Sequence, residues 1–189
     1  DTKIIDLCTG NGVVPIILNK RFNKSIDCIE IQEKLGADII MSFDECIPWP
    51  VSYEYAKKST ERTIRWAKRG KDAHKTNSAL FGIVQGADFE DLRKMCAEAL
   101  VEMDFPGYSI GGTSIGEPKE KCFEMVEYAV KYLPQDKPRY LMGVGSIDYL
   151  LGGIARGVDM FDCVLPTRLA RHGALMTSQG RVNIKNEKY

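Results

Sequence analysis

Residues 79–112, ALFGIVQGADFEDLRKMCAEALVEMDFPGYSIGG, decide the fold class. Two short, almost continuously apolar runs at residues 79–86 and 107–112 flank an amphipathic stretch at residues 89–103, for which Asp88 is the expected N-cap. Strands that are apolar on both faces are typical of parallel sheets covered by helices. A strand, a helix and a second strand in this order predict a βαβ unit of an α/β protein.

The same alternation continues on both sides of this unit. The other expected strands are residues 3–8, 25–31, 37–43, 139–145 and 160–166, and the other expected helices are residues 52–73, 120–133 and 146–157. Five strand–helix units fit between Ala37 and Tyr189, whereas a closed (β/α) barrel needs eight units and ~250 residues. We therefore predict an α/β fold, a partial (β/α) TIM-type barrel preceded by one Rossmann-like βα(β) unit. Barrel active sites lie at the carboxyl ends of the strands.

Composition limits the class of protein. The chain has 189 residues, 44% apolar and 28% charged, with 26 basic residues against 26 acidic ones, which excludes a disordered tail and a polycation. No apolar run approaches the ~20 residues of a membrane span, and we expect no signal peptide. Six scattered cysteines without a C-x-x-C pair, and only two histidines, predict reduced thiols, no metal site and a cytoplasmic location.

The charge is unevenly distributed along the chain. Residues 57–75 hold eight Lys or Arg against two acids, and residues 163–189 hold five against one. Each run is either a solvated surface or a surface that faces nucleic acid phosphates, and charge alone does not decide between them.

The segment DLCTGNG, residues 6–12, follows an expected strand and precedes an apolar run. Its glycines allow a sharp turn at a helix N-terminus, and an acid about 20 residues further on can accept ribose hydroxyls. Residues 1–32 resemble S-adenosylmethionine-dependent tRNA adenine-N6 methyltransferases, although the N-P-P-[YF] motif is absent. The resemblance implies S-adenosylmethionine as a cofactor at Asp6, Gly10, Gly12 and Glu30. The alternative is a turn that only connects a strand to a helix.

Seven blocks from Ile31 onward are similar to the bacterial tRNA-guanine transglycosylase family, also called queuine tRNA-ribosyltransferase. They are LGADIIMSFDECIPWP, ERTIRWAKR, ALFGIVQG, GYSIGG, GEPKE, RYLMGVG and MFDCVLPTRLARHG, in the order of the family. The resemblance implies an irregular (β/α) barrel over residues 33–189. It also implies exchange of the wobble guanine of tRNA for preQ1 in queuosine biosynthesis, with the tRNA anticodon loop as partner and a homodimer.

The resemblance assigns the nucleophile to Asp162. Base exchange passes through an oxocarbenium-like transition state, and a carboxylate can trap the ribose covalently before the incoming base attacks. By the same resemblance, the residues that recognise the base are Asp44, Gln85, Gly111 and Gly112, with Tyr108 and Met142 as apolar walls. Thr113 stands where many members of the family have Leu.

Two further stretches match segments of the family that contact RNA. Arginine suits this role because it stacks on bases and binds phosphates. The residues are Gly143, Val144, Gly145, Ser146, Ile147, Asp148, Tyr149, Thr167, Arg168, Leu169, Ala170 and Arg171. We expect His172 to have a structural role or to lie next to RNA rather than to act in catalysis.

The sequence also departs from the family. It lacks the D-S-G-G-x-Q segment that supplies the general acid/base aspartate, and the zinc-binding cysteines would lie after Tyr189. We therefore expect no turnover; if turnover occurred, Glu45 would be the first candidate for the missing acid. The string Ile29–Glu33 fits both resemblances, which predicts a chimeric or mis-joined chain. A methyltransferase fragment and a non-catalytic RNA-binding remnant remain alternative functions.

Overall fold

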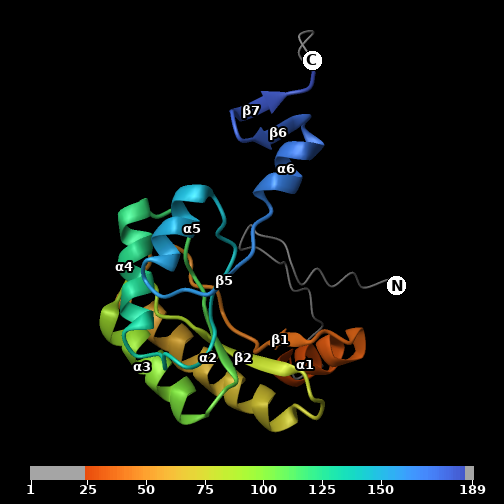
Figure 1. Ribbon diagram of the computed structural model, residues 1–189. Helices are drawn as coiled ribbons and strands as arrows, with labels where there is room; N and C mark the ends of the chain where they lie inside the picture. Colours follow the sequence, from red (N-terminus) through yellow and green to blue (C-terminus); the bar gives the residue numbers. More distant parts are fainter. Residues whose placement is uncertain (1–23, 186–189) are drawn as a thin grey trace.

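The computed structural model describes residues 24–185 of the chain (Figure 1). The expected strand at residues 3–8 and the glycine turn with Asp6, Gly10 and Gly12 lie outside the described residues. The interpretation of that turn as a cofactor site therefore stays a prediction.

The centre of the molecule is a curled sheet of five parallel strands in the order β1-β2-β3-β4-β5. The strands are β1 (Ile39–Met41), β2 (Ala79–Val84), β3 (Gly107–Ile110), β4 (Arg139–Leu141) and β5 (Met160–Phe161). Strand order follows chain order, as it does in a (β/α) barrel. The partial barrel that the sequence predicts is confirmed.

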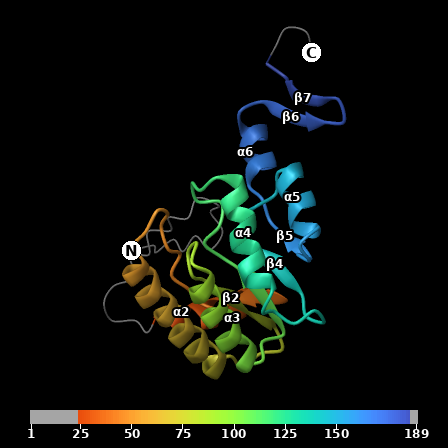
Figure 2. The same ribbon diagram turned by 90° about the vertical axis from the view of Figure 1, so that its left-hand side faces the viewer.

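Four helices connect consecutive strands and cover the convex face of the sheet (Figures 1 and 2). They are α2 (Tyr53–Ala73), α3 (Glu90–Glu102), α4 (Lys119–Val130) and α5 (Ile147–Ile154). The N-cap of α3 is Phe89, so the prediction of Asp88 as its cap is wrong. The turn explains the shift: Ala87 has a positive φ of 52° and the Phe89 N–H donates to the Gly86 carbonyl, so the helix starts one residue later.

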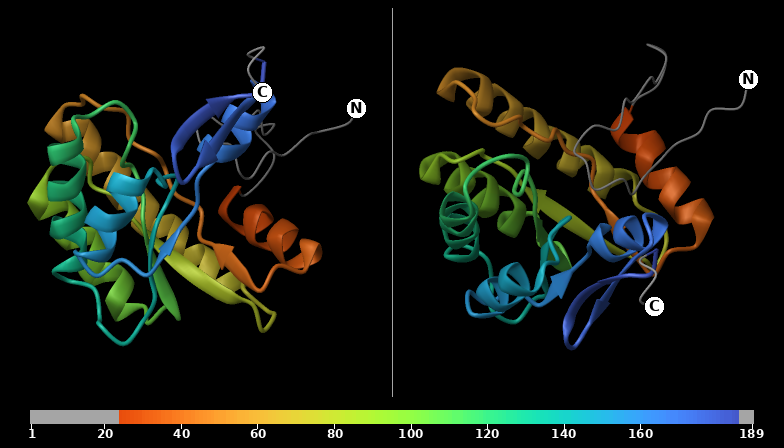
Figure 3. Two further views of the ribbon diagram at one scale, coloured as in Figure 1. Left: turned by 45° about the horizontal axis from the view of Figure 1, so that its top comes forward. Right: turned by 90° about the horizontal axis from the view of Figure 1, so that it is seen from above.

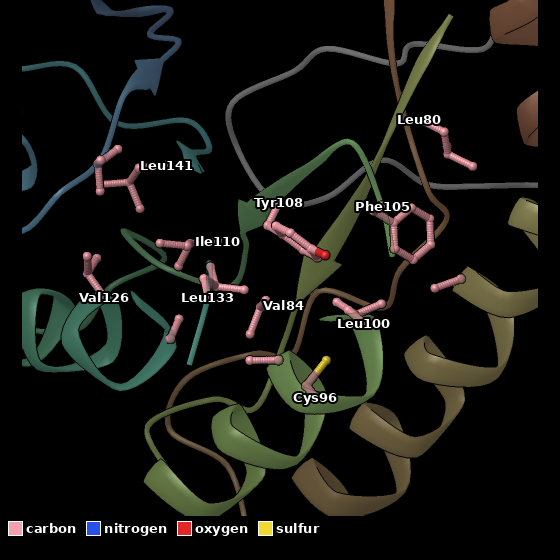
Figure 4. Close-up of a cluster of buried hydrophobic side chains, with 14 of the residues drawn as sticks. Leu80, Val84, Cys96, Leu100, Phe105, Tyr108, Ile110, Val126, Leu133 and Leu141 are labelled. Carbon is pink, nitrogen blue, oxygen red and sulfur yellow. The ribbon is translucent and has the colours of Figure 1, made fainter. Parts of the chain in front are cut away.

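The main hydrophobic core lies between the sheet and these helices (Figure 4). Leu80 and Val84 of β2 pack there with Leu100 of α3. The rings of Phe105 and Tyr108 meet edge to face, with centroids 6.5 Å apart. Burial of each large apolar side chain stabilises the fold by roughly 1.5–3 kcal/mol.

Helix α1 (Lys24–Leu35) packs beside α2 and the edge strand β1. The prediction of a strand at residues 25–31 is therefore wrong, and so is the placement of Glu30 at a strand end, because Glu30 is exposed on this helix. Tertiary contacts explain the helix. Ile29 is fully buried in the core, and the Gln32 side-chain amide exchanges two hydrogen bonds of 2.8 Å with the backbone of Met41. That amide thereby pairs with part of the open edge of β1.

The C-terminal part differs from the expected strand at residues 160–166. Strand β5 ends at Phe161, and α6 (Leu165–Arg171) begins instead, with Pro166 in its first turn, where a proline fits without loss of a hydrogen bond. An antiparallel hairpin of β6 (Ala174–Thr177) and β7 (Gly180–Asn183) follows, which the sequence analysis did not predict. Helix α6 and the hairpin project away from the sheet (Figures 1 and 3).

No described helix is both long enough and apolar enough to cross a membrane. The five cysteines in the described part of the chain are free: Cys28, Cys46, Cys96, Cys122 and Cys163.

Candidate active site

The candidate site residues follow the last residues of the five parallel strands. Gln85 and Gly111 come directly after β2 and β3, Met142 and Asp162 come directly after β4 and β5, and Asp44 follows β1 closely. Because the strands are parallel, these residues share one edge of the sheet. The structure therefore places them along one edge of the sheet.

At one end of this edge, Asp44 and Gln85 are in direct contact. The Gln85 Nε2 donates to Asp44 Oδ2 at 2.6 Å. Gln85 is fully buried, and its Oε1 has no hydrogen-bond partner in the described structure. A buried acceptor without a partner is rare and costly, which makes this atom available to a ligand.

Two glycines let the loop after β3 approach this pair. A Cβ at position 111 would lie 2.7 Å from Gln85 Nε2, and a Cβ at position 112 would collide with Gln85 Oε1. Gly112 also has a positive φ of 63°, which side chains other than glycine rarely adopt. Only glycine fits both positions.

Burial raises the pKa of Asp44 above its ordinary value, and the hydrogen bond from Gln85 offsets part of that rise. An ionised carboxylate can accept two N–H groups from one flat edge, such as the N1–H and 2-amino groups of guanine. The pair Asp44–Gln85 thus has the donors and acceptors that a purine edge requires.

Tyr108 and Met142 were the expected walls of the base pocket. Tyr108 is fully buried in the core that faces the helices, so its assignment as a wall is wrong. The cause is strand alternation: Tyr108 and Ile110 of β3 face the helices, and Gly111 faces the opposite side. Met142 is partly buried, and its N–H donates to the Ile110 carbonyl at 3.3 Å.

At the other end of the edge, Asp162 is exposed and held by two donors. Its Oδ1 accepts the Tyr140 hydroxyl and the Gly143 N–H, each at 2.6 Å. Its Oδ2 accepts no hydrogen bond from the described residues. One oxygen is therefore fixed by β4 and the turn after it, while the other can reach a substrate.

The loop at residues 143–149 has mixed exposure. Val144 is buried and its side chain packs into the main core, and its contact with RNA stays a prediction. Tyr149 is partly buried, with its ring 5.4 Å from that of Phe123. Asp148 is exposed, and hydrogen bonds from Lys119 and from Ser146 lower its pKa to about 2.

The remaining predicted residues of this loop differ in backbone conformation and in exposure to solvent. Gly143 has a positive φ of 72°, Gly145 lies against Cys163, and Ile147 is exposed. Residues 167–171 form most of α6, on which the described side chains are exposed or partly exposed. Helix α6 starts three residues after Asp162, so its arginines lie near Asp162 in sequence.

Glu45 is not placed to act as an acid. Its carboxylate accepts the Tyr55 hydroxyl at 2.8 Å and pairs with Arg62. Burial acts to raise its pKa, but the hydrogen bonds from Tyr55 and Arg62 outweigh burial and lower the pKa below the ordinary value. The structure therefore disfavours Glu45 as a substitute general acid.

Two charged residues that sequence reasoning missed hold the loop after β3. Glu117 accepts the N–H groups of Ser114 and Ile115, the latter at 2.8 Å. Arg93, fully buried in α3, donates to the carbonyls of Gly111 and Gly112. One signal was present: Arg93 shares its helix face with Cys96, Ala97 and Leu100, an i, i+3, i+4, i+7 pattern that is otherwise apolar.

Among residues 24–185, no three His, Cys, Asp or Glu side chains come together to hold a metal ion. The fold and this edge define the class of the protein: a partial (β/α) barrel with a hydrogen-bonded aspartate and glutamine at one end of the edge and an exposed aspartate at the other. The chain belongs to the queuine tRNA-ribosyltransferase family, whose family model matches residues 18–189.

Curated relatives carry the same name. The queuine tRNA-ribosyltransferase of Thermoanaerobacter sp. (strain X514) is 61% identical over 173 residues, which cover 90% of this chain and 46% of the relative. That of Thermoanaerobacter pseudethanolicus is 63% identical over 163 residues, 85% of this chain and 44% of the relative. That of Staphylococcus aureus (strain JH9) is 58% identical over 173 residues, with 90% and 46% covered. The chain thus spans somewhat less than half the length of these relatives.

The family match begins at residue 18, before the expected boundary between residues 32 and 33. Helix α1 crosses that boundary without interruption. The methyltransferase resemblance of the first residues stays a prediction.

Proposed function

We propose that this chain carries the base-recognition and nucleophile half of a tRNA-guanine transglycosylase, which exchanges the wobble guanine of a tRNA for preQ1 in queuosine biosynthesis. Family membership and the names of the relatives support the proposal. The observation that carries it is Asp162, whose Oδ1 is held by two donors while its Oδ2 accepts none from the described residues.

In the first step, Asp162 Oδ2 attacks C1′ of the ribose. The bond between C1′ and N9 of guanine breaks, its electron pair leaves with the base, and the base takes up a proton from a general acid. The charge that develops on the ribose is of oxocarbenium type, which a neighbouring carboxylate stabilises and then traps as an ester. Tyr140 and the Gly143 N–H keep the carboxylate in the orientation for attack. Such positioning of the reacting groups supplies much of an enzyme's rate enhancement.

In the second step, N9 of the incoming base attacks C1′ from the face that guanine vacated. The ester C1′–O bond breaks, the Asp162 carboxylate is restored, and the N9 proton of the incoming base passes to a general base. Two inversions leave the configuration at C1′ unchanged.

The base is held by Asp44, Gln85 and the loop at Gly112. Asp44 accepts N1–H and the 2-amino group, while the Gln85 amide and the loop N–H groups address the remaining polar edge. Guanine and preQ1 share this edge, so both fit the same residues. The tRNA anticodon loop is the partner that we propose, held by α6 and the loop at residues 143–149, and a homodimer in the cytoplasm is the proposed state.

An adduct assay tests the proposal. The purified chain is incubated with a tRNA that has guanine at the wobble position, and RNA-linked protein is separated on a denaturing gel and weighed by mass spectrometry. We expect a slowly formed adduct that Asp162→Asn abolishes. Asp136→Asn is the matched control, because Asp136 is an exposed carboxylate at the amino end of β4.

An adduct that persists in Asp162→Asn contradicts the assignment of the nucleophile. Tight tRNA binding with no adduct at all contradicts the proposed chemistry and supports the alternative, a non-catalytic RNA-binding remnant.

A further inference from the structure

Arg93 in α3 is fully buried, yet no carboxylate among the described residues forms an ion pair with it. Burial of an unpaired charge costs several kcal/mol unless hydrogen bonds compensate it. Burial also lowers the pKa of Arg93 to about 10, so the guanidinium stays charged at pH 7. A buried cation whose desolvation is unfavourable thus lies next to the loops of the candidate base site.

The guanidinium is satisfied by three backbone carbonyls. Its Nε donates to the Ala87 carbonyl at 2.7 Å. Its Nη1 and Nη2 both donate to the Gly111 carbonyl at 3.2 Å, and Nη2 also donates to the Gly112 carbonyl at 3.3 Å. Arg93 thus joins the loop after β2, which follows Gln85, to the loop after β3.

These contacts determine which backbone groups the loop can offer to a ligand. In a trans peptide the N–H points opposite to the carbonyl of the same unit. Because the carbonyls of Gly111 and Gly112 point at Arg93, the N–H groups of Gly112 and Thr113 point away from it. Neither N–H has a hydrogen-bond partner among the described residues.

The far end of the loop is held by the opposite charge. Glu117 is buried and accepts the N–H groups of Ser114 and Ile115. Between residues 111 and 115 a cation therefore holds two carbonyls, and an anion holds two N–H groups. The two N–H groups left over are those of Gly112, which lies against Gln85, and of Thr113.

We propose that Arg93 is a positioning residue that makes this loop present donors, so that the site prefers purines with an oxygen acceptor at position 6. The inference rests on the proposed function, because it takes Asp44 and Gln85 as the purine site. Without Arg93 the two peptide units can rotate, and a carbonyl can then replace an N–H at the base.

The test compares guanine with 6-thioguanine, which keeps the N1–H and 2-amino groups but offers a weaker acceptor at position 6. Affinities of both purines for the purified chain are measured by ligand-observed NMR. We expect the unchanged chain to prefer guanine. In Arg93→Lys and Arg93→Gln we expect that preference to fall about tenfold, the worth of one or two hydrogen bonds.

The ratio of the two affinities separates positioning from stability. A partly unfolded variant binds both purines more weakly by the same factor, which leaves the ratio unchanged. Arg139→Gln is the matched control. Arg139 is also buried and also donates to three carbonyls, at 2.8, 3.1 and 3.4 Å, but it lies at the amino end of β4. We expect Arg139→Gln to lower stability and keep the preference.

The outcomes distinguish the two claims. If Asp44→Asn weakens both purines while the Arg93 variants keep the preference for guanine, the role of Arg93 is overturned and the purine site stands. If the unchanged chain binds neither purine, the purine site itself is overturned, and the role of Arg93 with it.

Discussion

The edge formed by the carboxyl ends of the strands has two ends that differ in structure. Asp44, Gln85 and Gly112 follow three adjacent strands; Gln85 bonds Asp44 and lies against Gly112, and the buried Arg93 bonds the Gly112 carbonyl. Asp162 is exposed, follows a strand of two residues, and is held only through β4 and the turn after it among the described residues.

This difference indicates which part of the function the described chain organises by itself. At the end of the edge with Asp44 and Gln85, which we call the base end, the hydrogen bonds between side chains and loops are already formed without a ligand. Little ordering of the protein is therefore needed on binding. The nucleophile end has a fixed carboxylate but few surrounding groups, and the neighbouring α6 projects away from the sheet (Figure 2). We therefore expect recognition to survive in this chain better than catalysis.

The largest expected effect concerns turnover. Guanine must be protonated as Asp162 attacks, and general acid–base help of this kind is typically worth 10²–10⁴ in rate. Glu45 is engaged by Arg62 and Tyr55. We expect the 189-residue chain to incorporate radiolabelled guanine into tRNA at a rate lower by at least this factor than a full-length relative assayed in parallel. Multiple turnover at a comparable rate would show that another acid is present.

The second prediction compares core and hairpin. Leu100 is fully buried between α3 and the sheet, so Leu100→Ala should lower the free energy of unfolding by about 2–5 kcal/mol. Leu175 in β6 is 46% exposed, so Leu175→Ala should change it by no more than about 0.5 kcal/mol. Urea denaturation followed by circular dichroism measures both. Equal losses would mean that the hairpin packs on the barrel.

The third prediction concerns pH. Asp44 must be ionised to accept two N–H groups, and burial raises its pKa above the ordinary 3.8. Purine affinity should therefore be constant above that raised pKa and fall about tenfold per pH unit below it. The decline should begin at a higher pH than an exposed aspartate would give. Asp44→Asn should bind purines weakly and show no such decline of affinity at low pH. The same decline in that variant would assign the titration to another group.

The fourth prediction tests the support of the nucleophile. Tyr140→Phe removes one of the two donors to Asp162 Oδ1. A hydrogen bond to a charged group contributes about 1.5–3 kcal/mol, so the rate of adduct formation should fall roughly tenfold or more. Affinity for tRNA, measured by filter binding, should stay the same. A loss of affinity without a loss of rate would place Tyr140 in RNA binding instead.

The sequence predicts the strand ends well because each one combines a local signal with a rule of topology. Continuous apolar runs mark β1 to β4, and a parallel sheet then brings Asp44, Gln85, Gly111 and Asp162 to one edge. The strand expected at residues 25–31 is wrong because the β-branched residues around Ile29 favour a strand locally, whereas the packing of α1 against α2 and the two hydrogen bonds of Gln32 override that preference.

The site was predicted less completely than the fold. The family resemblance named Asp44, Gln85 and Asp162, which the structure places at one edge of the sheet, but it made Tyr108 a wall of the base pocket, whereas Tyr108 is buried on the side that faces the helices. Arg93 and Glu117 act on backbone groups, and no spacing in the sequence reveals which carbonyl a buried guanidinium will reach. Such contacts depend on how the loops after β2 and β3 turn, which only the three-dimensional structure gives.

The smallest expected effect concerns RNA binding, and it compares α6 with α2. Arg168 and Arg171 lie in the last turn of α6, while Arg65, Lys68 and Arg69 line a shallow depression on α2. Each phosphate contact on single-stranded RNA contributes about 0.7 to the slope of log affinity against log salt. Arg168→Ala with Arg171→Ala should therefore lower the slope by about 1.4, with a modest loss of tRNA affinity at physiological salt.

The double variant Arg65→Ala with Lys68→Ala should lower the slope by a similar or smaller amount if α2 also faces phosphates. Lys94→Ala with Lys131→Ala is the control, because these lysines lie on α3 and at the end of α4, away from both arginine clusters, and pair with Glu98 and Glu90. Fluorescence anisotropy of a labelled tRNA over a range of salt concentrations measures all three slopes. A slope that only the α2 variant lowers would move the RNA surface from the nucleophile end of the edge to the outside of the barrel. The nucleophile would then need a second element to bring the anticodon loop to Asp162.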